Sequence, residues 1–114
     1  MDTILLCSHN PILVKSLYGI LRDEGYSVDV AEHPSQAVHM VMGKSFSSVI
    51  IDPEPFGLSV DDAVKIIRSV APETLVIFVG NDSPETDALS IEVPINLLEF
   101  RKAIKTLHRI QHVH

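Results

Sequence analysis

The sequence has only one cysteine and no tryptophan among its 114 residues. A single cysteine excludes an internal disulfide, which is typical of cytosolic proteins. Long apolar runs are also missing, so no segment reaches the length that a membrane span requires. Asp2 and Thr3 stand where a signal peptide would carry basic residues. These absences predict a cytoplasmic protein that does not associate with a membrane.

Basic residues are few: Lys and Arg number 9 against 15 Asp and Glu, which gives a net charge of −6. Nucleic-acid backbones are bound by clustered Lys and Arg, so this balance predicts no nucleic-acid partner. Apolar residues make up 46% of the chain and charged residues 21%, as in ordinary globular proteins. Together with the length, this composition predicts one domain that spans residues 1–114.

Short apolar runs alternate with amphipathic segments along the chain. The runs predict strands at residues 3–7, 26–30, 49–51, 75–79 and 90–93. The segments between them predict helices that begin at Pro11, Pro34 and Ser59, and a last helix after Asn96. Such alternation gives a parallel sheet with helices on both faces, because crossover connections are right-handed. The predicted class is therefore α/β, a three-layer αβα sandwich around a five-stranded parallel sheet.

The ends of the first helix are marked in the sequence. Asn10 is a favourable N-cap, and Pro11 suits the first helical position. Gly25 is expected to end this helix. Apolar residues at helical spacing predict the inward faces of the four helices: Leu13, Leu17, Ile20 and Leu21; Val38, Val41 and Met42; Val60, Ala63, Ile66 and Ile67; and Leu97, Phe100, Ile104 and Leu107.

The connection between the fourth and fifth strands, residues 80–90, is short and holds three acidic residues and one proline. It is too short for an ordinary crossover helix, so this helix is predicted to be shortened or missing. Strands four and five would then lack cover on one face, and bare apolar side chains favour a partner. We therefore expect a homodimer through these strands, with the last helix nearby. The last helix also carries a basic stripe, which either meets an acidic partner or faces solvent. This stripe consists of Arg101, Lys102, Lys105 and Arg109.

Asp52 is the residue on which the functional interpretation depends. It directly follows three β-branched residues that predict a buried strand, and Pro53 blocks the continuation of that strand. In parallel α/β sheets, ligands gather just beyond the carboxyl ends of the strands. The sequence therefore predicts that Asp52 lies where such a sheet places its functional groups.

The chain resembles the receiver domain of two-component response regulators over nearly its whole length. The resemblance rests on Ile4-Leu5-Leu6-Cys7 with Pro11, Gly25-Tyr26-Ser27-Val28, Ala31 and Ala37, Val49-Ile50-Ile51-Asp52, Gly57, Ile67-Arg68, Val76-Ile77-Phe78-Val79 and Pro94. Each piece is weak alone, but their combination at these spacings is specific. The resemblance implies a flavodoxin-like or receiver-like strand order, 2-1-3-4-5.

The resemblance also implies that Asp52 holds the position of the phosphoacceptor, and that the pocket around it is degenerate. The residues that align with the two Mg²⁺-binding carboxylates are Ser8 and His9. Gly80 aligns with the hydroxyl residue, Val93 with the lysine and Ser90 with the switch aromatic.

A phosphoryl group in transfer needs its negative charge neutralised, and Mg²⁺ usually needs more than one carboxylate. We therefore interpret the chain as a pseudo-receiver, a phosphorylation-independent protein–protein interaction module without enzymatic activity, metal or cofactor. Its partner would be a histidine kinase or another signalling protein.

Two alternatives stay open at this point. The first is a conventional phosphorelay receiver, phosphorylated at Asp52 with Mg²⁺ as cofactor. The second is a phosphocysteine transfer domain that uses Cys7, although the loop after Cys7 has neither the glycines nor the arginine that cradle phosphate. Transition-metal sites are weaker options, from His9 with Asp52 and His33, or from two histidines one turn apart: His108 and His112.

Overall fold

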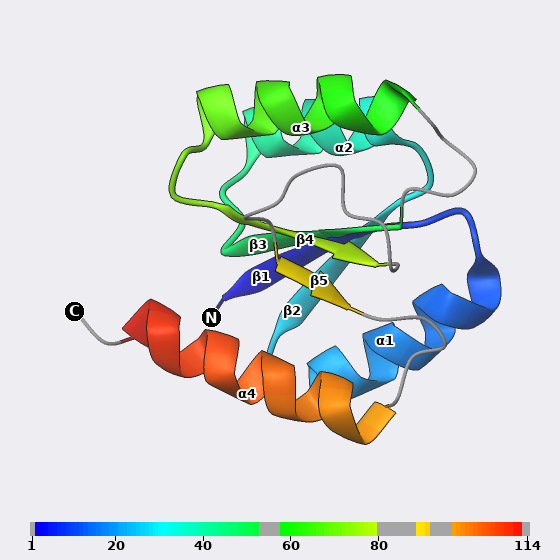
Figure 1. The fold of residues 1–114 in the computed structure, drawn as a ribbon, viewed down its shortest axis with the longest axis vertical. Coiled ribbons are helices and arrows are strands. Elements are labelled where there is room, and N and C mark those ends of the chain that lie inside the picture. The colour runs from blue at the N-terminus through cyan, green and yellow to red at the C-terminus, as the bar shows by residue number, and fades with distance from the viewer. Residues whose placement is uncertain (1, 53–57, 80–88, 92–96, 113–114) are drawn as a thin grey trace.

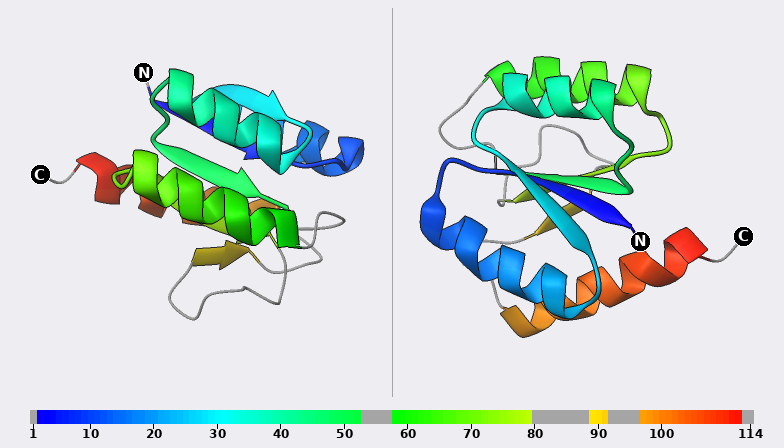
Figure 2. Two further views of the ribbon diagram at one scale, coloured as in Figure 1. Left: turned by 90° about the horizontal axis from the view of Figure 1, so that it is seen from above. Right: turned by 180° about the vertical axis from the view of Figure 1, so that it is seen from behind.

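A central parallel sheet lies between two pairs of helices in the computed structural model of the chain (Figure 1). The structure describes residues 2–52, 58–79, 89–91 and 97–112, with side chains described for residues 2–52, 61–79 and 98–105. Helices α2 and α3 cover one face of the sheet, and α1 and α4 cover the other. The two further views in Figure 2 show the same three layers. The predicted αβα sandwich is confirmed.

The strands are β1 (Thr3–Cys7), β2 (Ser27–Ala31), β3 (Ser48–Ile51), β4 (Leu75–Val79) and β5 (Leu89–Ile91). The four longer strands have the order β2-β1-β3-β4, as predicted, and the three-residue β5 pairs in parallel with β4 at the edge. Three predicted strands have different bounds: β2 lies one residue later than residues 26–30, β3 begins one residue before residue 49, and β5 begins one residue before residue 90. Residues 92 and 93, the predicted end of the fifth strand, lie outside the described residues. The predicted loss of a helix between β4 and β5 concerns residues 80–88, which lie outside the described residues.

The helices are α1 (Pro11–Asp23), α2 (Pro34–Gly43), α3 (Leu58–Val70) and α4 (Leu97–His112). At the start of α1, the side chain of Asn10 accepts hydrogen bonds from the backbone amides of Ile12 and Leu13. At its end, Gly25 has a φ of 94°, a conformation that glycine adopts without a steric penalty. The amide of Gly25 donates to the carbonyl of Arg22, and that of Tyr26 donates to Leu21, which is a Schellman cap. Both predicted ends of α1 are confirmed.

Two apolar cores fill the spaces between the layers, because successive strand residues point to opposite faces. Residues at alternate positions of β1 and β3 pack under α2 and α3 with Ala37, Val41, Val64 and Ile67. The other positions pack against α1 and α4 with Leu17, Leu21, Phe100 and Ile104. Every residue of β3 is buried, so the strand that leads to Asp52 is enclosed along its whole length.

Of the predicted inward positions with described side chains, two are wrong; Val60, Leu97 and Leu107 lie outside that set. Met42 is 67% exposed and Ile66 is 42% exposed. The buried stripe of α2 runs through Pro34, Ala37 and Val41, about 100° away from Met42 around the helix. In α3 the buried side chains are Ala63, Val64 and Ile67, and Ile66 lies roughly 110° around the helix from the middle of this face.

The predicted cap of the third helix also differs from the structure. Helix α3 begins at Leu58, so Ser59 lies inside the first turn and is not the residue before it. Helix α4 begins directly after Asn96, which itself lies outside the described residues. None of the described helices combines the length and hydropathy that a membrane-spanning segment requires.

Candidate functional site

The candidate site lies at the carboxyl edge of the sheet, where β1 and β3 end side by side. Cys7, the last residue of β1, is in register with Ile51, the last residue of β3. The backbone amide of Asp52 donates to the carbonyl of Cys7 over 2.9 Å, so the pairing continues one residue beyond β3. This places Asp52 beside Ser8, the first residue after β1.

Ser8 and Asp52 are joined by a side-chain hydrogen bond. The hydroxyl Oγ of Ser8 donates to Oδ2 of Asp52 over 3.1 Å, and Ser8 is only 2% exposed. The Ser8 backbone amide donates to the carbonyl of Ala31, which fixes the residue against β2. Asp52 itself is half-buried. One neighbour that the fold gives to this carboxylate is therefore a neutral hydroxyl donor.

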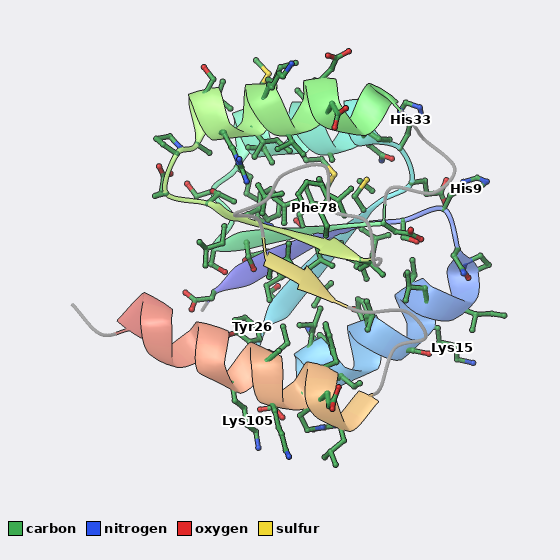
Figure 3. All side chains as sticks on the ribbon, in the orientation of Figure 1. His9, Lys15, Tyr26, His33, Phe78 and Lys105 are labelled. Atoms are coloured by element: carbon green, nitrogen blue, oxygen red, sulfur yellow. The ribbon has the colours of Figure 1, made fainter. Side chains whose placement is uncertain are left out.

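The predicted histidines lie at the same edge of the sheet but do not form a metal site. His9 and His33 are both exposed, and Figure 3 shows them at the ends of the β1–α1 and β2–α2 connections. His33 caps α2, since its Nδ1 accepts a hydrogen bond from the Ser35 amide over 3.1 Å. Among the described residues, no three His, Cys, Asp or Glu side chains group closely enough to hold a metal ion. The side chains of His108 and His112 lie outside the described set.

The structure gives no support to a nucleophilic role for Cys7. Its side chain is completely buried in the core under α2 and α3. Burial, and secondarily the negative charge of Asp52, raise the pKa of the Cys7 thiol to about 12. The thiolate is the reactive form, so at neutral pH Cys7 is an inert core residue.

The side chains at three of the predicted pocket positions are not among those that the structure describes. Gly80 and Val93 lie outside the described residues. Ser90 lies in β5, paired in register with Phe78 of β4, but its side chain is not among those described. Their assignment as degenerate pocket positions stays a prediction.

Two features of the site were missed when the sequence was read alone. Pro53 follows Asp52 and has no backbone N–H, so the peptide after Asp52 offers no donor to a group attached to its carboxylate. The backbone amide of Asn10 donates to Oγ of Ser8 over 3.0 Å, which connects the site to the cap of α1. The first feature is readable from the sequence, whereas the second needs the loop conformation.

Solved structures of receiver domains are similar to this chain over almost its full length. A response regulator receiver domain from Methanospirillum hungatei JF-1 has a TM-score of 0.81 and 22% identity, covering 96% of this chain and 95% of its own. The beryllofluoride-activated receiver domain dimer of NtrC4 has a TM-score of 0.79 and 25% identity, with coverage of 94% and 96%.

A third similar structure is the receiver domain of Ssk1 from Saccharomyces cerevisiae, crystallised with the histidine phosphotransfer protein Ypd1. Here the TM-score is 0.78 and the identity 15%, with coverage of 98% of this chain and 92% of the other. No protein-family model matches the sequence, and neither does any curated protein. The chain therefore has the fold of a response regulator receiver domain, and the predicted resemblance is confirmed at that level.

Proposed function

We propose that this chain is a receiver-type domain of two-component signalling that acts as a protein–protein interaction module without phosphorylation of Asp52. The observation that carries this proposal is the hydrogen bond from Ser8 Oγ to Asp52 Oδ2. It places a neutral, buried donor beside the carboxylate that a receiver would phosphorylate. The domain would span residues 1–114 and would have no enzymatic activity of its own.

Electrostatics support this proposal. Mg²⁺ binds through several oxygen ligands, usually including more than one carboxylate, and Ser8 contributes no charge. Transfer of a phosphoryl group depends on neutralising negative charge, and the Ser8 hydroxyl that donates to Asp52 is neutral. His9 is exposed, and Pro53 cannot donate a backbone hydrogen bond. Under this proposal the chain keeps the position of the carboxylate, and Ser8, Gly80 and Val93 stand where a phosphorylation switch would carry its other groups.

Proteins are the expected partners. The Ssk1 receiver domain was crystallised with a phosphotransfer protein, and the NtrC4 receiver domain is a dimer, so this fold supports both kinds of contact. For this chain we propose a homodimer through β4, β5 and α4, or binding of a signalling protein such as a histidine kinase. The cytoplasmic location and the absence of a nucleic-acid partner stay predictions from the sequence.

An NMR titration with Mg²⁺ and beryllofluoride tests the proposed loss of phosphorylation. Amide signals of Ser8, Asp52 and their neighbours should not shift in a saturable way. The matched variant is Ser8→Asp, which adds the missing carboxylate beside Asp52 and should gain Mg²⁺-dependent shifts. Saturable binding by the unaltered chain would overturn the proposal.

The conventional receiver is the alternative that one observation favours, since Asp52 is half-exposed at the carboxyl end of a central strand. Incubation with acetyl phosphate and Mg²⁺, followed by mass spectrometry, tests it directly. A mass increase of one phosphoryl group that is lost in Asp52→Asn would establish this alternative. Persistence of the label in Asp52→Asn and its loss in Cys7→Ser would instead identify a phosphocysteine.

Sedimentation tests the proposed homodimer. A dimer at high micromolar concentration is expected, and a monomer at that concentration would count against it. Charge reversal at Lys105→Glu, on the exposed face of α4, should weaken association if that helix borders the interface. Lys15→Glu on α1 is the control, because it makes the same change of charge on a helix that the proposal does not use; both lysines are labelled in Figure 3.

A further inference from the structure

A continuous series of hydrogen bonds runs from Asp52 to the first turn of α1. Ser8 Oγ donates to Asp52 Oδ2 over 3.1 Å, and the Asn10 backbone amide donates to Ser8 Oγ over 3.0 Å. The side-chain Oδ1 of Asn10 then accepts from the amides of Ile12 and Leu13 over 3.0 and 3.2 Å. Residues separated by more than forty positions in the sequence are thereby joined through one hydroxyl group.

The chemistry of a hydroxyl gives this series a direction. An ionised carboxylate only accepts hydrogen bonds, so the single O–H of Ser8 is used on Asp52 and its lone pairs are left for the amide of Asn10. Hydrogen bonds in series polarise one another, and a bond to a charged acceptor is stronger than one to a neutral acceptor. A change in the charge of Asp52 should therefore alter the bond between Ser8 and Asn10.

The far end of the series is a helix cap that lies at the surface. Asn10 satisfies two of the backbone amides that have no partner within α1, so its placement fixes the start of that helix. The first turn carries Ile12, whose side chain is 78% exposed. Movement of the Asn10 backbone would thus change the surface that α1 presents to other proteins.

We propose that Ser8 is a positioning residue that couples the state of the Asp52 carboxylate to the N-terminus of α1. This coupling requires neither Mg²⁺ nor a phosphoryl group, so it goes beyond the proposed interaction module and does not depend on it. It gives Asp52 a role as the acceptor that holds the β1–α1 connection in place. It also makes the Ser8 hydroxyl a route by which a change at Asp52 reaches α1.

Amide hydrogen exchange measured by NMR tests the coupling, with four proteins compared in the absence of Mg²⁺ and phosphodonors. These are the unaltered chain, Asp52→Ala, Ser8→Ala and the double variant. The Asn10 amide should exchange about two- to tenfold faster in Asp52→Ala, because the bond that it donates to Ser8 Oγ is weakened. In the Ser8→Ala background, Asp52→Ala should produce no further change at Asn10, Ile12 or Leu13.

Two further variants keep the test decisive. Asp52→Asn retains an acceptor oxygen without the charge, so its Asn10 exchange rate should lie between those of the unaltered chain and Asp52→Ala. Ser8→Thr retains the hydroxyl and should restore most of the protection that Ser8→Ala loses. Ser35→Ala is the control, since it removes a serine bonded at the start of α2 and should leave α1 unchanged.

Two results would overturn the coupling. One is an unchanged Asn10 exchange rate in both Asp52 variants. The other is an equal effect of Asp52→Ala with and without the Ser8 hydroxyl, which would show that the two residues do not act through each other. Because no metal or phosphodonor is present, either result leaves the proposed function untouched.

Discussion

Buried hydroxyl groups lie at both ends of the sheet, but they differ in their hydrogen-bond partners. At the carboxyl end, the Ser8 hydroxyl contacts the Asp52 carboxylate and the Asn10 amide. At the amino end, the hydroxyl of Ser48 is completely buried and has no hydrogen-bond partner within the described part of the chain. Thr74, also at the amino end, donates its hydroxyl to the carbonyl of Phe46 over 2.8 Å.

This difference shows which buried hydroxyls connect parts of the fold and which one the fold only tolerates. A buried hydroxyl without a partner costs stability, so the fold tolerates Ser48 without using it. The Thr74 hydroxyl ties the loop before β4 to the loop before β3, which is a purely structural contact. Of these three hydroxyls, that of Ser8 alone joins a charged group to the surface of a helix, and this is why we assign a functional role to the carboxyl end.

The largest effect is expected at the amino end, from Thr74→Val. This nearly isosteric change leaves the buried carbonyl of Phe46 without its donor, so the free energy of unfolding should fall by about 1–3 kcal/mol. Urea denaturation measures the change. A loss below that range would show that water replaces the hydroxyl, and the amino end would then be less enclosed than the structure indicates.

Cys7 provides the second prediction, because burial, and secondarily the negative charge of Asp52, raise the pKa of its thiol. Its pKa is about 12 in the folded chain against an ordinary value of 9.0, so the thiol ionises more readily after unfolding. Stability linked to this group is fully present below pH 9 and decreases as the pH rises toward 12. At pH 10 the loss should be on the order of 1 kcal/mol. Urea denaturation of Cys7→Ala across the same pH range should lack this component; an identical pH profile would contradict it.

Ser8→Ala is the third change in order of size. It removes both hydrogen bonds of the hydroxyl, and partial exposure of Asp52 limits the cost, so the unfolding free energy should fall by about 1 kcal/mol. Thermal or urea denaturation measures this loss. An unchanged stability would mean that solvent serves Asp52 and Asn10 equally well, and the distinction between the two ends would then disappear.

The smallest effect is expected from Ser48→Ala. Removing a buried hydroxyl that has no described partner relieves its desolvation cost, while the small space left behind offsets that gain. The unfolding free energy should change by less than about 0.5 kcal/mol or rise slightly. A loss as large as that of Thr74→Val would show that Ser48 has a partner after all, which makes this variant the sharpest test of the comparison.

Local patterns predicted much of the fold correctly. The apolar runs located the strands, and Asn10 and Gly25 located the two ends of α1 because capping depends on neighbouring residues alone. Apart from the strand bounds and the cap of α3, the errors came from helix phase. Met42 and Ile66 are apolar residues adjacent to buried ones, and only packing against the sheet decides which of two neighbours faces inward.

The candidate site was predicted in part for the same reason. Asp52 could be located because a buried strand and a proline define its position. The alignment of Ser8 with a lost carboxylate followed from the resemblance, but its bonds to Asp52 and Asn10 did not, since they depend on how the β1–α1 connection folds over the edge of the sheet.

The sequence by itself determined the alternation of strands and helices, the caps of α1 and the presence of an uncharged side chain at Ser8. Each of these depends on residue type and local spacing. The tertiary structure alone decided that the Ser8 hydroxyl donates to Asp52 and that Cys7 is fully enclosed. Both depend on β1 and β3 lying side by side, and this pairing brings together residues more than forty positions apart through hydrogen bonds and packing that no local pattern encodes.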